Sequence, residues 1–154
     1  MKKGLKVYMV KVDLGNDKAV VADCFESARQ LVHDFLCDRG RKAFIKSVKE
    51  IETPYANERL YTDVEPWEVV SIDTPKKLTI RKMTCVELPW ERDFIPGGFV
   101  GHTANDREQK WDIKSDEAGL RVSIRLHKDL TWRIRDGQRF SVCDKPVKFY
   151  DNNF

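Results

Sequence analysis

The amino-acid sequence predicts an α+β protein, in which an N-terminal ββαβ unit with one amphipathic helix precedes a mainly antiparallel β-sheet subdomain. Apolar residues recur with the period of a helix in one segment of the N-terminal third. In several other segments they alternate with polar residues, which is the period of a strand that is buried on one face. Turn residues separate these alternating runs, as is typical of antiparallel neighbours.

The composition is that of a globular protein with nearly balanced charge. The 154 residues are 41% hydrophobic, which is enough for one core or for two small subdomains that share one. Charged residues make up 34% of the chain and the formal net charge is +3, so net charge by itself does not indicate a nucleic-acid binder. The charges are unevenly distributed, since residues 53–119 carry 9 basic and 13 acidic side chains whereas residues 120–154 carry 8 and 4.

The expected location is the cytoplasm, without membrane contact. The four cysteines are widely spaced and include no Cys-x-x-Cys pair, which favours free thiols over a disulfide framework. No apolar run reaches the length of a membrane span, and the first residues lack the apolar centre of a signal peptide. No cofactor fingerprint occurs, so we expect no cofactor.

Residues 1–52 predict the ββαβ unit. Two runs rich in valine, residues 5–14 and 19–22, predict the strands of a hairpin. The next segment has apolar residues at helical spacing, namely Ala28, Leu31, Val32 and Phe35. Gly40 is placed to end that helix, and residues 43–51 predict a third strand. The helix would then cover one face of a small sheet.

The middle of the chain is less regular. Residues 53–64 have no period and predict a connector, after which residues 65–154 form the antiparallel subdomain. The two parts are also compatible with one compact domain. Residues 67–72 and 78–86 predict strands, the second at a rim or edge because polar residues interrupt its apolar face. Residues 89–107 predict a long loop, and long loops in compact domains are often functional.

The clearest alternation lies in residues 120–142. The positions on its apolar face are Leu120, Val122, Ile124, Leu126, Leu130, Trp132, Ile134, Phe140 and Val142. These positions predict three antiparallel strands, because the apolar residues of neighbouring strands must share a face. Three-residue loops would place Trp132 opposite Ile124 on one side and opposite Val142 on the other.

This register gathers arginines on the polar face. Arg121, Arg135 and Arg139 fall in one row. Arg125 and Arg133 lie in the adjoining rows. Like charges in cross-strand positions repel each other, and a bound phosphate or carboxylate would replace that repulsion with charge-assisted hydrogen bonds. We therefore predict that these five arginines bind nucleic acid, a nucleotide or an acidic protein surface.

A structural role is the alternative explanation for these arginines. A strand predicted at residues 109–114 would place Asp112 opposite Arg121. Acidic residues could then dock on the arginines, through Asp112, Asp116 or Glu117. No aromatic residue shares the predicted basic face, so phosphate contact is expected rather than base readout.

The leading functional prediction is a small cytosolic, non-enzymatic binding protein with an anionic partner. An alternative is an inhibitor or adaptor directed at a partner protein, of the kind found in mobile elements such as phages. It would use the acidic, aromatic middle segment, in which Trp90, Phe94 and Phe99 are candidate interface residues.

The enzymatic alternative is a metal-dependent nuclease. Asp93, Asp112 and Lys114 follow the order in which two carboxylates hold an ion and a lysine steadies the attacking water. His102 and His127 could instead act as an acid–base pair for phosphodiester chemistry. Both patterns also arise by chance in a charge-rich chain, so a protein without catalytic activity is favoured.

One further spacing points weakly to a metal ion. His33 and Cys37 lie four residues apart on the predicted helix, which puts two metal ligands on one face. Zinc requires a third and usually a fourth ligand, and only residues distant in sequence, such as Cys24 or Cys143, could supply them. The sequence therefore predicts no metal site.

Overall fold

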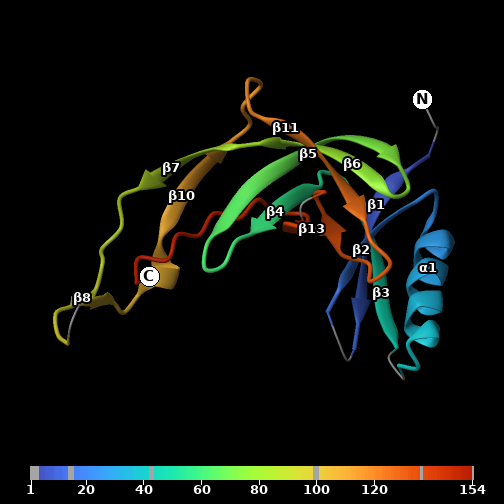
Figure 1. Ribbon diagram of the computed structural model, residues 1–154, viewed down its shortest axis with the longest axis horizontal. Coiled ribbons are helices and arrows are strands. Elements are labelled where there is room, and N and C mark those ends of the chain that lie inside the picture. The colour runs from blue at the N-terminus through green and yellow to red at the C-terminus, as the bar shows by residue number, and fades with distance from the viewer. Residues whose placement is uncertain (1–3, 14–15, 42–43, 99–100, 136, 154) are drawn as a thin grey trace.

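The structure is a computed structural model that describes residues 4–13, 16–41, 44–98, 101–135 and 137–153. Figure 1 shows an arch with a helix and a small sheet at one end, a barrel in the middle and a two-stranded arm at the other end. All strand pairings are antiparallel, and one α-helix occurs in the described residues, as an α+β class requires. None of the described helices is long and apolar enough to cross a membrane.

The N-terminal end of the arch contains the expected ββαβ elements. Its strands are β1 (Lys6–Val12), β2 (Lys18–Ala22) and β3 (Ile45–Ile51), which form a sheet in the order β2-β1-β3. The helix α1 (Phe25–Asp38) lies on one face of this sheet. Ala28, Val32 and Leu36 are the buried residues of its apolar stripe, and they pack on Val10 and Val20.

Gly40 ends the helix as its position in the sequence predicts. It adopts a left-handed conformation with φ of 62°, which a residue with a side chain rarely tolerates. Its N–H donates to the carbonyl of Cys37 at 2.9 Å, and the N–H of Arg41 donates to the carbonyl of Leu36 at 3.0 Å. Two carbonyls of the last turn, which the helix itself cannot satisfy, are thereby hydrogen-bonded.

The main feature of the molecule is a closed six-stranded barrel, which the sequence did not predict. Its strands are β4 (Tyr55–Arg59), β5 (Val64–Thr74), β6 (Lys77–Lys82), β11 (Arg121–Leu126), β12 (Trp132–Arg133) and β13 (Arg139–Cys143). They pair in the order β11-β12-β13-β4-β5-β6, and β6 pairs with β11 to close the wall. Closure leaves inward positions buried, among them Leu78, Ile80 and Ile124.

Two expectations for the middle of the chain were wrong. Residues 53–64 contain β4, which pairs with β13 on one side and with β5 on the other. Its alternation is inconspicuous because the inward positions hold Ala56 and Glu58 instead of large apolar residues. The indole of Trp67 donates to the Glu58 carboxylate at 3.0 Å, which allows the acidic residue to face inward. The strand predicted at an edge over residues 78–86 is divided between β6, which β5 and β11 flank inside the barrel, and a second strand at residues 84–88 that belongs to a two-stranded ribbon, so the edge prediction was wrong only for β6.

The register of the C-terminal strands differs from the prediction by two residues. Trp132 lies opposite Leu126 and Phe140, not opposite Ile124 and Val142. The five-residue turn that contains Leu130 accounts for the shift between β11 and β12, because the N–H of His127 bonds the carbonyl of Thr131. A shift of two keeps every side chain on its predicted face, whereas a shift of one would invert the strand.

The arm is a separate ribbon that leaves the barrel after β6. It consists of β7 (Thr84–Leu88) and β10 (Lys110–Lys114), with β8 (Phe94–Ile95), β9 (His102–Thr103) and a short 3₁₀ helix (Asp106–Glu108) at its far end. The predicted pairing of Asp112 with Arg121 was therefore wrong, because Asp112 lies opposite Val86. The C-terminal residues run along the arm, where Asn153 exchanges hydrogen bonds with the backbone of Thr103.

The N-terminal sheet and the barrel share one apolar core. Val7, Ala19 and Val21 project from the sheet face opposite the helix and join a cluster that contains Ile80 and Ile124 of the barrel. The indole N–H of Trp132, which is 2% exposed, donates to the carbonyl of Ala19 at 2.8 Å. The sheet thus lies between the helix and the barrel, and a barrel side chain satisfies the backbone at its β2 edge.

We expect Trp132→Phe to lower the free energy of unfolding by about 2–4 kcal/mol, since it leaves the Ala19 carbonyl without its donor and opens a cavity in the shared core. Trp90→Phe is the matched control, because the Trp90 indole bonds the exposed carboxylate of Glu87 on the arm. That change should cost less than about 0.5 kcal/mol. Urea unfolding of both variants measures the difference, and equal losses would contradict the role given to Trp132.

Candidate functional site

A row of basic side chains crosses the outer wall of the barrel. Lys77, Arg125, Arg133, Arg139 and Arg59 occupy directly opposite positions on β6, β11, β12, β13 and β4, and we call these five residues the basic row. Neighbouring strands are about 4.8 Å apart, so the row is roughly 19 Å long. The row crosses five of the six strands of the barrel, so it wraps around the wall instead of lying on one flat surface.

Two members of the basic row have acidic partners. The Lys77 ammonium lies 3.7 Å from the carboxylate of Asp73, and the Arg133 guanidinium pairs with Asp129. The other three are Arg125, Arg139 and Arg59. In the described part of the chain, no carboxylate lies within 4.0 Å of their guanidinium nitrogens. The row therefore carries uncompensated positive charge.

Asp129 is held in its ionised form beside Arg133. Its Oδ1 accepts hydrogen bonds from the hydroxyl of Thr131 at 2.6 Å and from the Thr131 N–H at 3.2 Å. Burial would raise the pKa of this carboxyl, but the Thr131 hydrogen bonds and the Arg133 charge outweigh burial and hold the pKa below its ordinary value. Arg133 is consequently fixed in place by a local ion pair.

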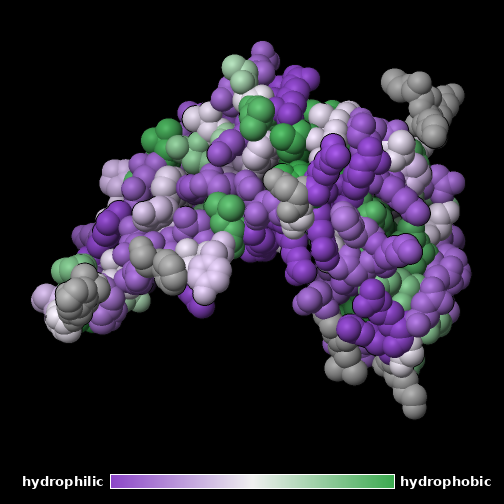
Figure 2. Space-filling model, in the orientation of Figure 1, coloured by the Kyte–Doolittle hydropathy of each residue, from purple (hydrophilic) through white to green (hydrophobic). Residues whose placement is uncertain are grey.

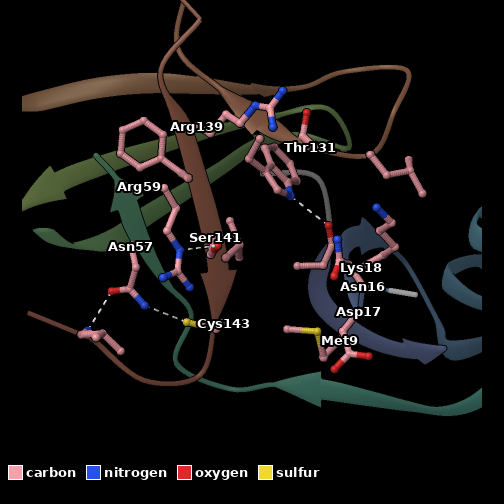
Figure 3. A pocket seen from close by; sticks show the side chains of 16 residues that line it. Met9, Asn16, Asp17, Lys18, Asn57, Arg59, Thr131, Arg139, Ser141 and Cys143 are labelled. Atoms are coloured by element: carbon pink, nitrogen blue, oxygen red, sulfur yellow. Dashed lines mark hydrogen bonds between the residues drawn. The ribbon is translucent and has the colours of Figure 1, made fainter. Parts of the chain in front are cut away.

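A pocket of about 510 Å³ opens where β13 and β4 meet the β1–β2 hairpin (Figure 3). We call it the junction pocket. It forms because β12 is only two residues long, which leaves Ser141 and Cys143 without a β12 partner. Its polar lining comes from Asn16, Asp17, Lys18, Asn57, Arg59, Thr131, Arg139, Ser141 and Cys143. Met9, Leu130 and Trp132 are among its apolar residues.

Arg59 and Arg139 are directly opposite each other on β4 and β13, but their side chains point in different directions. Figure 3 shows the Arg59 side chain running along β13 toward Ser141, whose hydroxyl accepts a hydrogen bond from Arg59 Nε at 2.9 Å. The Arg139 side chain points the other way, toward Thr131. This divergence reduces the repulsion between the two charges and presents a guanidinium in each half of the pocket.

Asn57 forms the rigid base of the pocket. It is 1% exposed, and its amide donates to the Lys145 carbonyl at 3.0 Å and accepts from the Val147 N–H at 2.8 Å. These bonds fix the start of the C-terminal tail over β4. Burial raises the pKa of the neighbouring Cys143 thiol, which makes it a poor nucleophile.

The five arginines predicted from the sequence separate into two groups. Arg125, Arg133 and Arg139 lie in the basic row, although in a different register from the predicted one. Arg121 lies opposite Arg81, and exposed Arg135 follows the end of β12.

Sequence reasoning missed two members of the basic row. Arg59 lies in the segment that the sequence predicted as a connector, and Lys77 lies one residue before the start of the predicted strand at residues 78–86. The one available signal was that Arg59 and Asn57 alternate with Ala56 and Glu58, which is the period of a strand.

The residues of the nuclease hypothesis are not gathered into a metal site. Lys114 forms an ion pair with Asp112 at 3.1 Å on β10, while Asp93 lies at the far end of the arm. Across the described ranges, no group of three or more His, Cys, Asp or Glu side chains could hold a metal ion. His102 is in β9 of the arm, whereas His127 follows β11 of the barrel, so the two imidazoles come from different parts of the molecule.

The helix pair His33 and Cys37 is exposed, with 3.8 Å between Sγ and the imidazole nitrogens. No third ligand joins it in the described chain. All four cysteines, Cys24, Cys37, Cys85 and Cys143, are free, as the sequence predicted.

The predicted protein-interface residues belong to the arm. Phe94 and Ile95 at its far end are 60% and 43% exposed. Trp90 is half-buried, and its indole donates to Glu87 at 2.7 Å. Phe99 lies outside the described residues. Figure 2 shows the arm standing away from the body across a notch, with apolar side chains in separate patches on a hydrophilic surface.

No protein-family model, curated protein or solved structure matches this chain. We therefore infer its function from the basic row and the junction pocket.

Asp129→Asn should lower the free energy of unfolding by about 1 kcal/mol at pH 7, because the Arg133 charge loses its partner. A carboxyl with a depressed pKa stabilises the folded state above its unfolded pKa, about 3.9, and loses that effect as the pH falls through its folded pKa. The difference between the two proteins should thus shrink from pH 5 toward pH 3 in urea unfolding. Exposed Asp144→Asn is the control, and a difference independent of pH would refute the ion pair.

Proposed function

We propose that this protein is a non-enzymatic binding protein whose partner is a polyanion, with nucleic acid as the first candidate. The observation that carries the proposal is the opposite placement of Arg59 and Arg139 on β4 and β13, with no described carboxylate paired to either. A like-charge cross-strand pair costs from a few tenths to about 1 kcal/mol, and the divergence of these two side chains places this pair toward the lower end of that range. A bound anion would convert this cost into charge-assisted hydrogen bonds.

Phosphate is the anion that this surface suits best. Guanidinium groups bind phosphate in a bidentate manner, and the hydroxyl of Ser141, which accepts a hydrogen bond from Arg59, still has its own proton to donate to a phosphate in the junction pocket. The basic row offers charge and no aromatic ring on which a base could stack. Contacts to the phosphate backbone position a nucleic acid without reading its sequence, so we expect weak sequence preference and strong salt dependence.

The curvature of the basic row favours a flexible strand over a duplex. A row that wraps around a narrow barrel can be followed only by a chain that bends on the same scale, whereas duplex DNA is stiff over about 150 base pairs. A single nucleotide could occupy the junction pocket, but there it would contact only Arg59 and Arg139 of the basic row. Single-stranded nucleic acid is thus the proposed ligand. The four free thiols are consistent with a cytoplasmic setting.

The double variant Arg59→Gln with Arg139→Gln tests the proposal. Removing two phosphate contacts should weaken binding to a single-stranded oligonucleotide and reduce the salt slope of log K by about 1.4. Fluorescence anisotropy across a salt series measures both quantities. The control carries Arg29→Gln and Arg107→Gln, two exposed arginines on the helix and the arm. Unchanged affinity and slope in the first variant would disprove the proposal.

A second function, recognition of a partner protein, is favoured by the exposed apolar side chains of the arm. Val86, Leu88, Phe94 and Ile95 are between 41% and 60% exposed, and all four lie on β7 or β8. Aromatic and aliphatic residues that remain exposed on a projecting element commonly anchor interfaces. An inhibitor or adaptor would present this arm to its target.

For this second function, Phe94→Ser with Ile95→Ser should abolish capture of a partner from nuclease-treated lysate. The capture should persist in about 1 M NaCl, where the Debye length is only about 3 Å, because apolar contacts are not screened. Phe44→Ser is the control, since Phe44 is 73% exposed and lies outside the arm. Capture that is lost at high salt, or that survives in the double variant, would argue against the arm.

A further inference from the structure

We propose that the gap between β11 and β12 binds an extended acidic peptide, which adds a strand to the free edge of β11. The barrel wall is incomplete there. β11 pairs with β6 over five residues, Arg121 to Arg125, but with β12 only at Arg125 and Leu126. Beyond these two residues, no backbone hydrogen bond joins residues 121–124 to the described residues of the following turn. We call this gap the seam.

The seam exists because the chain turns immediately after β12. The N–H of Ile134 donates to the carbonyl of Gln138 at 3.1 Å, and the N–H of Gly137 donates to the carbonyl of Ile134 at 3.0 Å. Gly137 has φ of 96°, a conformation suited to glycine in a tight turn. These bonds close the turn toward β13, so the ladder with β11 is not continued.

The seam contains a pocket of about 610 Å³ with an apolar base. Its lining consists of Val122, Ser123, Ile134 and Arg135. Val122 and Ile134 pack against the barrel core, whereas Ser123 and Arg135 are exposed at the rim. A side chain that enters the seam would therefore contact two branched aliphatic residues.

The backbone of β11 offers hydrogen bonds in the same place. Successive residues of a strand direct their N–H and C=O groups to opposite sides, so those groups of about half of residues 121–124 face the seam and not β6. An unpaired edge of this kind is a template for an added strand. Arg121 and Arg125 are exposed at the two ends of this edge. Their positive charges would repel those of a second copy of the protein and so oppose pairing between two such edges.

These charges select the chemistry of the partner. No described carboxylate lies within 4.0 Å of the side-chain nitrogens of Arg121, Arg125 or Arg135. An added strand would direct alternate side chains toward the aliphatic base and toward the arginines. The matching peptide alternates acidic and small β-branched residues, as in Glu-Val-Glu-Val-Glu. Nucleic acid lacks the regularly spaced amide groups that the β11 edge would bond.

The test uses the full-length protein and fluorescein-labelled acetyl-Glu-Val-Glu-Val-Glu-amide in fluorescence anisotropy. Methylating the amide nitrogens that face β11 removes donors without changing charge, and we expect at least about tenfold weaker binding because the hydrogen bonds to the β11 edge are lost. Because the strand could bind in either register, both alternate sets of nitrogens are methylated in separate peptides. A peptide of the same composition, Glu-Glu-Val-Val-Glu, should also bind more weakly because its residues do not alternate.

Protein variants locate the peptide. Val122→Thr keeps the shape of the side chain and should weaken binding several-fold, whereas Val86→Thr on the arm should not change it. Hydrogen exchange of amides within residues 121–124 should slow on peptide addition. Equal binding of the unmodified and both methylated peptides would overturn strand addition and indicate charge attraction only, as would unchanged exchange.

This inference does not depend on the proposed binding of nucleic acid, although Arg125 belongs to both surfaces. The variant with Arg59→Gln and Arg139→Gln should retain peptide binding, because neither residue lines the seam. Loss of peptide binding in that variant would place the peptide in the junction pocket and refute the seam as its site.

Discussion

The constraint on which the structure depends is the single apolar core shared by the barrel and the N-terminal sheet. One face of that sheet packs on the helix through Val10 and Val20, and the other packs on the barrel through Val7 and Val21. The Trp132 indole satisfies the Ala19 carbonyl at the boundary, where an unbonded carbonyl would cost about 1–3 kcal/mol. The sheet is therefore held from both sides, and a one-residue shift of register in the barrel would turn its apolar side chains away from this core.

Closure of the barrel determines where the charged residues lie. Once Ile124, Trp132 and Phe140 face inward, the residues next to them must face outward, because side chains alternate along a strand. Closure then places Arg59, from a strand distant in sequence, directly beside Arg139. The basic row is thus a consequence of burying apolar residues. Its uncompensated charge has no such structural explanation and is the reason for proposing a ligand.

The short strand β12 connects the two proposed binding regions. With only two residues, it leaves β13 unpaired beside Ser141, where the junction pocket opens, and leaves β11 unpaired beside Val122, where the seam opens. Both openings combine exposed arginine with accessible apolar surface. A longer β12 would have completed the wall and removed both. Irregularities in a sheet are commonly associated with functional sites, and here one irregularity accounts for both of the proposed binding regions.

The sequence determined the local elements and the face of each side chain. The amphipathic helix ending at Gly40 and the alternation around Ile124 depend on neighbouring residues, so both could be inferred from the chain alone. Only the tertiary structure decided the register of β12, the inclusion of β4 in the barrel, and the pairing of β10 with β7 instead of β11. Registers that differ by two residues bury the same faces, so the sequence does not distinguish between them. The strand β4 was missed because Glu58 faces inward, which is possible only because the Trp67 indole donates a hydrogen bond to its carboxylate. The sequence identified most of these arginines as exposed strand residues. Which of them lie side by side depends on pairing between strands that are far apart in sequence, such as β4 and β13.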